Sequence, residues 1–204
     1  MFAASPYSVT DAAELTQALS DIVTVDNGTG IIDLTADIDY SSTIDIDYAS
    51  GFDSVTINLN GFNLDVDVTA SPEDIAIEVQ NGATLTVNGT GSLTAAAFNA
   101  NAVYVYKSTL SVNSGGELTA IGESALGEAT ASVYVTDGTL SMDGSSAIYV
   151  QGFDRGVYAY DGAVATVTSV TTGDPSTDDR GVYANGSEII VMGDVTTEGV
   201  NRKA

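Results

Sequence analysis

The chain has 204 residues, of which 44% are hydrophobic, and its 28 acidic and five basic residues give a net charge of −23 at pH 7. A chain of this length and apolar content can bury a sizeable core, so the charge does not mark a disordered tail. The charge repels phosphate and so excludes binding to nucleic acid or anionic membranes, and the absence of His and Cys excludes disulfides, thiolate metal sites and the commonest general base.

The first predicted element is a short amphipathic helix over residues 8–20. Thr10 or Asp11 can cap its N-terminus. Leu15, Ala18 and Leu19 form one apolar stripe at helical spacing. A helix in this position can cover the apolar cross-section of a following repeat array, which would otherwise be an open edge. We therefore predict a capping helix.

Short strand patterns follow the helix almost without interruption. Residues 37–40 and 43–48 alternate apolar and acidic side chains, and residues 55–59 alternate apolar and polar ones. Gly residues, often after Asn or Asp, separate the strands and permit tight corners. No linker divides the sequence, so we predict one domain over 1–204, with β-coils over 30–204.

A Val/Tyr-rich strand recurs along the second half and is followed by a turn and, in most copies, by a Thr/Leu-rich strand. The copies lie at residues 75–79, 103–105, 133–135, 156–159 and 181–184. The spacing of roughly 24 to 30 residues, made only of strands and turns, is typical of a solenoid. A β-sandwich has no reason to repeat one motif in register. The sequence therefore predicts an all-β parallel β-helix.

Three segments, at residues 30–38, 42–46 and 55–64, resemble the opening coils of right-handed parallel β-helix domains with a pectin-lyase-like fold. The Leu59-Asn60-Gly61 turn and the coil at residues 81–87 are similar to turns and coils of that family. Such domains occur in secreted and surface-anchored prokaryotic proteins, so the resemblance implies a right-handed β-helix and an extracellular or cell-surface location. Fold analogy alone does not supply an activity.

Two further observations bear on location. No apolar run approaches the roughly 20 residues that a membrane-spanning helix needs, so we expect no membrane insertion. No signal peptide is recognisable at Met1, and we expect that the chain begins after a removed one. The alternative is that it never had one.

The resemblance to pectate lyases and polygalacturonases raises the question of catalysis. Those enzymes combine clustered Asp residues with calcium, a basic residue or His. The acidic segment 174–179 before Arg180 could supply a carboxylate pair. The same Asp-Arg-Gly-Val-Tyr pattern recurs at residues 154–158, and a repeated feature is typical of structural stacking. We expect no enzymatic activity.

Tyrosines occupy equivalent places in four of the Val/Tyr strands. If the flanking Val residues point inward, the rings form an outward ladder of Tyr104, Tyr134, Tyr158 and Tyr183, with Tyr106 and Tyr160 beside it. A row of tyrosines is a platform for a polysaccharide or a neighbouring protomer. The alternative is that the rings only stabilise the solenoid by cross-strand packing.

Three Asp-x-Asp pairs suggest a calcium site: Asp37 and Asp39, Asp45 and Asp47, and Asp65 and Asp67. If their strands stack, carboxylates of neighbouring coils lie about 5 Å apart. Calcium would relieve this repulsion, because carboxylate oxygens are its preferred ligands. The alternative is a solvated acidic face. No other cofactor is expected.

Hydroxyl pairs follow the tyrosine strands, at Thr84/Thr86, Thr109/Ser111, Thr139/Ser141 and Thr166/Thr168. They resemble the Thr ladders of ice-binding β-helices. The Ser substitutions and the unequal coil lengths favour ordinary strand propensity at outward positions instead.

The C-terminal segment starts another coil without a recognisable cap. It contains the predicted self-assembly end, Val200, Asn201, Arg202 and Lys203, whereas residues 1–106 contain no basic residue. Either the sequence is part of a longer protein, or the terminal coil docks on another copy, because an uncapped end invites strand addition. The charge asymmetry favours head-to-tail contacts between copies. We therefore expect a homo-oligomeric, non-enzymatic, extracellular structural or adhesive solenoid of a cell surface, sheath or filament. The alternative is a carbohydrate-binding β-helix module assisted by calcium.

Overall fold

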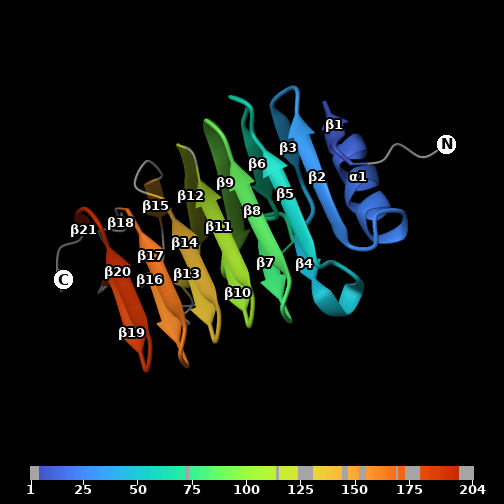
Figure 1. Cartoon of the computed structure of the whole chain (residues 1–204). Helices are drawn as coiled ribbons and strands as arrows, with labels where there is room; N and C mark the ends of the chain where they lie inside the picture. Colours follow the sequence, from blue (N-terminus) through green and yellow to red (C-terminus); the bar gives the residue numbers. More distant parts are fainter. Residues whose placement is uncertain are drawn as a thin grey trace.

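The computed structural model describes residues 5–71, 74–113, 115–123, 131–143, 147–151, 155–168, 170–172 and 180–197. These residues form a parallel β-solenoid of about six turns with one α-helix at its N-terminal end (Figure 1). The coils wind in the right-handed sense that parallel strands of one sheet almost always adopt. The predicted all-β solenoid with an N-terminal helical cap is confirmed.

Each complete coil contributes a strand to each of three parallel sheets. The eight-stranded sheet contains, in order, β1 (Tyr7–Val9), β2 (Thr29–Leu34), β5 (Ser54–Asn58), β8 (Thr84–Asn88), β11 (Thr109–Asn113), β14 (Thr139–Met142), β17 (Val164–Val167) and β20 (Glu188–Val191). The six-stranded sheet contains β4 (Ile44–Asp47), β7 (Ile77–Gln80), β10 (Val103–Tyr106), β13 (Ala131–Thr136), β16 (Arg155–Tyr160) and β19 (Arg180–Asn185). The seven-stranded sheet contains β3 (Ile38–Tyr40), β6 (Leu64–Asp67), β9 (Gly91–Phe98), β12 (Gly116–Glu123), β15 (Ala147–Gln151), β18 (Val170–Thr172) and β21 (Val195–Thr197).

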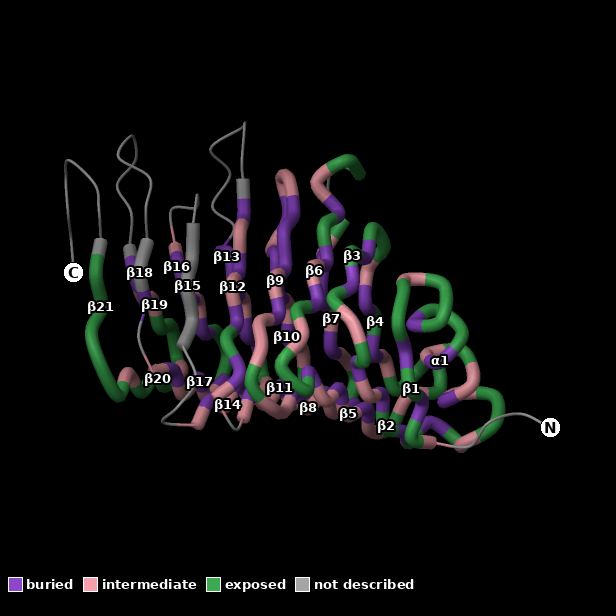
Figure 2. The backbone as a smooth tube through the Cα atoms, turned by 90° about the horizontal axis from the view of Figure 1, so that it is seen from above, coloured by how far each residue is buried: buried purple, intermediate pink, exposed green. Residues whose placement is uncertain are grey.

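The core runs along the inside of the solenoid. Strand side chains alternate between the two sides of each sheet, and the inward positions carry Val, Ile, Leu and Ala (Figure 2). The register of the Val/Tyr strands is the one that the sequence repeat predicts: Val105 lies opposite Val135, which lies opposite Ala159. All three are fully buried. Equivalent residues of successive coils therefore stack on one another.

The N-terminal end of the solenoid is closed by α1 (Ala12–Thr24). Asp11 caps the helix by accepting a hydrogen bond from the Glu14 backbone N–H, and the Glu14 carboxylate accepts one from the Thr10 backbone N–H. These two hydrogen bonds cap the N-terminus of the helix, which starts at Ala12. Leu15, Ala18 and Ile22 form the buried face. The helix covers the first coil as predicted.

The boundaries of this end differ from the prediction of a helix over 8–20 and coils from residue 30. Residues Tyr7–Val9 form β1, which pairs with β2, so the eight-stranded sheet starts before the helix. The helix also extends to Thr24, because Ile22 continues its apolar stripe, whereas Leu19 is only partly buried. Three residues of strand are too short to carry a recognisable alternation in the sequence.

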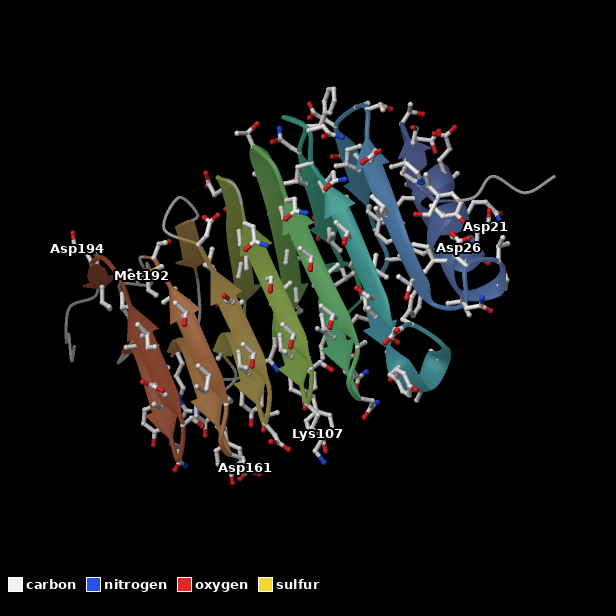
Figure 3. All side chains as sticks on the ribbon, in the orientation of Figure 1. Asp21, Asp26, Lys107, Asp161, Met192 and Asp194 are labelled. Atoms are coloured by element: carbon white, nitrogen blue, oxygen red, sulfur yellow. The ribbon has the colours of Figure 1, made fainter. Side chains whose placement is uncertain are left out.

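Tight corners join the sheets, as the Asn/Asp-Gly pairs predict. Asn60 and Gly61 have φ values of 55° and 90°, and Asp161 and Gly162 have values of 56° and 82°. Gly and Asn or Asp adopt this left-handed region at the lowest cost. Lys107 occupies such a position with φ 51°. Figure 3 shows Lys107 and Asp161 projecting from the same edge of the solenoid, where the six-stranded sheet turns into the eight-stranded one.

Candidate functional site

The outward face of the six-stranded sheet carries a continuous ladder of large side chains. Successive strands place the following residues directly opposite one another: Asp45, Glu78, Tyr104, Tyr134, Tyr158 and Tyr183. We call the last four the tyrosine ladder. It contains the four predicted tyrosines in the predicted register. Tyr106 and Tyr160 lie two residues further along their strands, on the same side of the sheet.

The rings of the tyrosine ladder lean on one another along the solenoid axis. The ring centroids of Tyr134 and Tyr158 are 4.9 Å apart with planes only 9° from parallel. Rings this close and parallel must overlap face to face with an offset. One face of each ring is therefore covered by the other ring. The rings form a stack rather than a flat platform.

The pairs on either side of this stack are more open. Tyr104 and Tyr134 have centroids 5.5 Å apart and planes tilted by 35°. Tyr158 and Tyr183 are 5.1 Å apart with a tilt of 56°. A tilt exposes part of a ring face, and the negative face of an aromatic ring attracts cations.

A guanidinium group occupies the more tilted of these pairs. The Arg155 guanidinium carbon lies 4.7 Å from the ring centroid of Tyr158 and 4.9 Å from that of Tyr183, over both rings. At the neighbouring corner, the Lys107 ammonium lies 5.0 Å over the ring of Tyr106. Such contacts contribute about 0.5 to 2 kcal/mol each. The face therefore binds cations of its own chain. Sequence analysis missed this, although Arg155 precedes Tyr158 by three residues.

Two carboxylates continue the ladder toward the N-terminal end of the sheet. Glu78 lies opposite Tyr104 on one side and Asp45 on the other. Burial raises the pKa of Glu78, and the charges of Asp45 and Asp47 raise it further. Burial also raises the pKa of Asp45, against a hydrogen bond with Gln80 that lowers it. Burial therefore disfavours the charged form of both carboxylates in the folded state.

We expect the substitution Glu78→Gln to stabilise the protein at pH 7 by a few tenths to about 1 kcal/mol, because it removes a like charge directly opposite Asp45. The folded pKa of Glu78 is raised, so protonation favours the folded state. The wild type is therefore as stable as the variant or more stable at acid pH, where Glu78 is protonated. It becomes less stable than the variant as the pH rises through the pKa of Glu78. Urea unfolding of wild type and variant at pH 7 and at acid pH measures the difference in the free energy of unfolding.

The control for this prediction is Glu117→Gln. Glu117 projects from the seven-stranded sheet and lies opposite Ser92 and Ala147, which are uncharged. We expect its replacement to leave the free energy of unfolding at pH 7 nearly unchanged. A Glu78→Gln variant that is less stable than the wild type at pH 7 would contradict the repulsion argument.

The six aspartates predicted as calcium ligands divide between two sheets. Asp39 and Asp65 lie opposite each other on β3 and β6, whereas Asp45 and Asp47 belong to the six-stranded sheet. Asp37 instead accepts a hydrogen bond from the Asn63 backbone N–H. Among the three Asp-x-Asp motifs, the described strands therefore stack one carboxylate pair, Asp39 and Asp65. No group of three metal-ligating side chains converges within the described residues. Calcium binding stays a prediction.

Asp39, Asp65 and Asp67 line an open groove of about 800 Å³ on the outside of the seven-stranded sheet, with Ala96 and Ile121 among its apolar residues. Asp67 is held locally, since its carboxylate accepts hydrogen bonds from both the hydroxyl and the backbone N–H of Thr69. These hydrogen bonds lower the pKa of Asp67. The groove is acidic and open.

An asparagine ladder in the eight-stranded sheet was missed by sequence analysis. The Asn58 amide donates to the Asp33 carboxylate at 2.7 Å, the Asn88 amide to Asn58 at 3.4 Å, and the Asn113 amide to Asn88 at 3.4 Å. The available signal was an Asn directly after each apolar strand position, as in Ile57-Asn58 and Val87-Asn88. Side-chain amides stacked in this way bond one coil to the next.

The hydroxyl pairs also occupy the outward side of the eight-stranded sheet. Thr84, Thr109 and Thr139 lie opposite one another in successive coils. Thr166, however, lies opposite Ser141 rather than Thr139, whose own partner is Val164. The predicted pair Thr166/Thr168 is therefore shifted along the strand.

The C-terminal end differs from the closed N-terminal end. The predicted assembly residues Val200, Asn201, Arg202 and Lys203 lie outside the described residues. In the last described coil, Val195 takes the inward position of Val170 in the coil before it, yet its exposed fraction is 37% against 0%. The side chain of Met192 is 52% exposed and lies at this end in Figure 3.

Comparison with protein-family models, with curated proteins and with solved structures finds no match for this chain. The fold therefore defines only a class, a parallel β-solenoid closed at its N-terminal end by a helix. Among the described residues, no helix has both the length and the apolar character that crossing a membrane requires.

Proposed function

We propose that the chain is a non-enzymatic structural or adhesive module of a cell surface, sheath or filament, located outside the cell. The observation that carries the proposal is the difference in burial between the first coil and the last described coil. Leu15 and Ile22 of α1 close the first coil and are fully buried. The inward residues Val182, Ile189 and Val191 of the last described coil are only partly buried.

The partly exposed apolar side chains of the last described coil support assembly for a physical reason. β19, β20 and β21 are the last described strands of their sheets. A sheet edge with unpaired backbone groups and partly exposed apolar side chains is a template for strand addition. A module that acts through such an edge needs no catalytic constellation.

The closed end limits the geometry of this assembly. α1 lies over the first coil, so a second copy cannot stack directly on β3 and β4 in head-to-tail fashion without displacing the helix. In the proposed assembly, the last described coil instead pairs with the same coil of a second copy, or accepts a strand of another polypeptide. The first arrangement closes as a dimer, because both copies use the same surface.

We expect the protein to self-associate with rising concentration, and Val195→Asp to restore the monomer. The new carboxylate would be buried in the contact, which is unfavourable without a partner. Thr196→Asp is the matched control, since Thr196 is the exposed neighbour of Val195 on the same strand. Sedimentation velocity and light scattering measure the mass. A wild type that stays monomeric at high concentration and low salt would refute assembly through this end.

A further inference from the structure

The position of Arg155 can be followed through the coils. Ala131 lies directly opposite Arg155 in the preceding coil. One coil further back, the Asn101 side chain accepts a hydrogen bond from the Ala131 backbone N–H at 3.1 Å, and Asn101 precedes Val103 as Arg155 precedes Val157. The cation that lies over Tyr158 and Tyr183 is thus replaced by uncharged residues in the two preceding coils.

The tilt between neighbouring tyrosine rings differs between the coil that carries Ala131 and the coil that carries Asn101. Where Ala131 replaces the arginine, Tyr134 and Tyr158 close into a parallel stack with a 9° tilt. Tyr104 and Tyr134, beside Asn101, keep a 35° tilt and a wider centroid separation of 5.5 Å. The Tyr104–Tyr134 pair is therefore open in the same sense as the pair that holds Arg155. No cation of the described residues lies over it.

The charge beside this open pair is the opposite of the charge beside Tyr158 and Tyr183. Glu78 is the direct neighbour of Tyr104 in the ladder, and Asp45 follows it. The two carboxylates repel each other and stand in a chain of net charge −23. A cation placed over the rings would be attracted by the negative ring faces and would also relieve the repulsion between Asp45 and Glu78.

We propose that Tyr104, Tyr134 and Glu78 form a docking site for an arginine-bearing segment of a basic polypeptide partner. Arginine is favoured over lysine, because its planar guanidinium can lie against an aromatic ring while donating two hydrogen bonds to a carboxylate. Arg155 on Tyr158 and Tyr183 is the internal example of the ring contact. The site deepens the adhesive part of the proposed function by naming a partner class.

A neutral polysaccharide fits this site less well. Sugars bind aromatic residues by lying on exposed ring faces, and the facing sides of the central pair, Tyr134 and Tyr158, are covered by each other. A neutral sugar also leaves the repulsion between Asp45 and Glu78 unchanged. The charge and the ring geometry together favour a cationic partner.

The test is a titration of the protein at low salt with a short peptide of alternating arginine and glycine, followed by fluorescence anisotropy. The control peptide replaces arginine by citrulline, which has the same shape without the charge. We expect the arginine peptide to bind and the citrulline peptide not to bind. Glu78→Gln and Tyr104→Leu should each weaken binding by roughly tenfold. Glu78→Gln is expected to fold, since it relieves repulsion.

Matched variants distinguish binding at this site from attraction to the overall negative charge of the protein. Glu117→Gln removes the same charge from another sheet and should change the affinity by less than about twofold. Asn101→Arg places a guanidinium at the position equivalent to Arg155 and should block the peptide by occupying the rings. Val195→Asp alters the proposed assembly end and should leave peptide binding unchanged, so the two proposals fail independently.

Three results would overturn the proposal. The first is equal weakening by Glu78→Gln and Glu117→Gln, which would mean attraction to the overall charge alone. The second is equal binding of the arginine and citrulline peptides. The third is a protein that does not bind the arginine peptide but is retained on insoluble cellulose or chitin, with Tyr104→Leu abolishing the retention. This result would assign the face to a polysaccharide.

Discussion

Replacing Ile22 by aspartate is expected to lower the free energy of unfolding by at least about 4 kcal/mol. Ile22 is fully buried on the inner face of α1, and its side chain lies against the backbone of Gly30 in β2, where a Cβ atom would have no room. The substitution removes this apolar contact and places a carboxylate in a site without water. Urea unfolding followed by circular dichroism measures the loss.

The variant should also open the N-terminal edges of two sheets. β3 and β4 are the first strands of the seven-stranded and six-stranded sheets, and α1 covers this end. We therefore expect faster amide hydrogen exchange in β3 and β4, together with concentration-dependent aggregation. Ser20→Asp, on the exposed side of the same helix, is the control and should change the free energy of unfolding by less than about 1 kcal/mol. A loss of that small size for Ile22→Asp would show that the helix does not hold the first coil.

The sequence predicted the fold well because the repeat carried two independent signals. Val, Tyr and Val alternate between the two sides of a strand, and the same alternation returns one coil later. Together they predicted that Tyr134 would lie opposite Tyr104 and Tyr158, which is the register observed. The helix boundaries were less accurate, because β1 has only three residues and looked like the start of the helix.

The site was predicted only in part, because period-two alternation assigns a residue to a side of a strand but not to a sheet. Asp39 and Asp45 have the same alternation, yet they belong to different sheets. Glu78 lies in the first copy of the repeat, residues 75–79, at the place that Tyr104 takes in the second copy. Asp45 lies before these copies, so its alignment with Glu78 could not be predicted from the repeat.

Replacing Gly91 by alanine is expected to lower the free energy of unfolding by more than about 3 kcal/mol, through two separate effects. Gly91, the first residue of β9, has φ 124°, a conformation that residues with a Cβ rarely adopt. A Cβ atom there would also collide with the Phe62 carbonyl oxygen of the preceding coil and lie 3.2 Å from the Leu59 Cβ.

The preceding coil cannot move away to accommodate this atom. The Gly61 backbone N–H donates to the Thr90 carbonyl oxygen at 2.6 Å, which fixes the distance between the two corners. The alanine variant must therefore break this contact or distort the turn at Leu59 to Phe62. Because the asparagine ladder crosses the same two coils through Asn58 and Asn88, the distortion would extend to the eight-stranded sheet.

Gly82→Ala separates backbone strain from this collision. Gly82 has φ 100°, and a Cβ atom at this position would meet no other atom within 4 Å. Its replacement should cost only the strain of the left-handed conformation, about 1 to 2 kcal/mol. Urea midpoints of the two variants, measured side by side, give the difference. Equal costs would mean that the coils tolerate closer approach at Gly91, and that their spacing is set by the stacked side chains of the core rather than by contact between backbone corners.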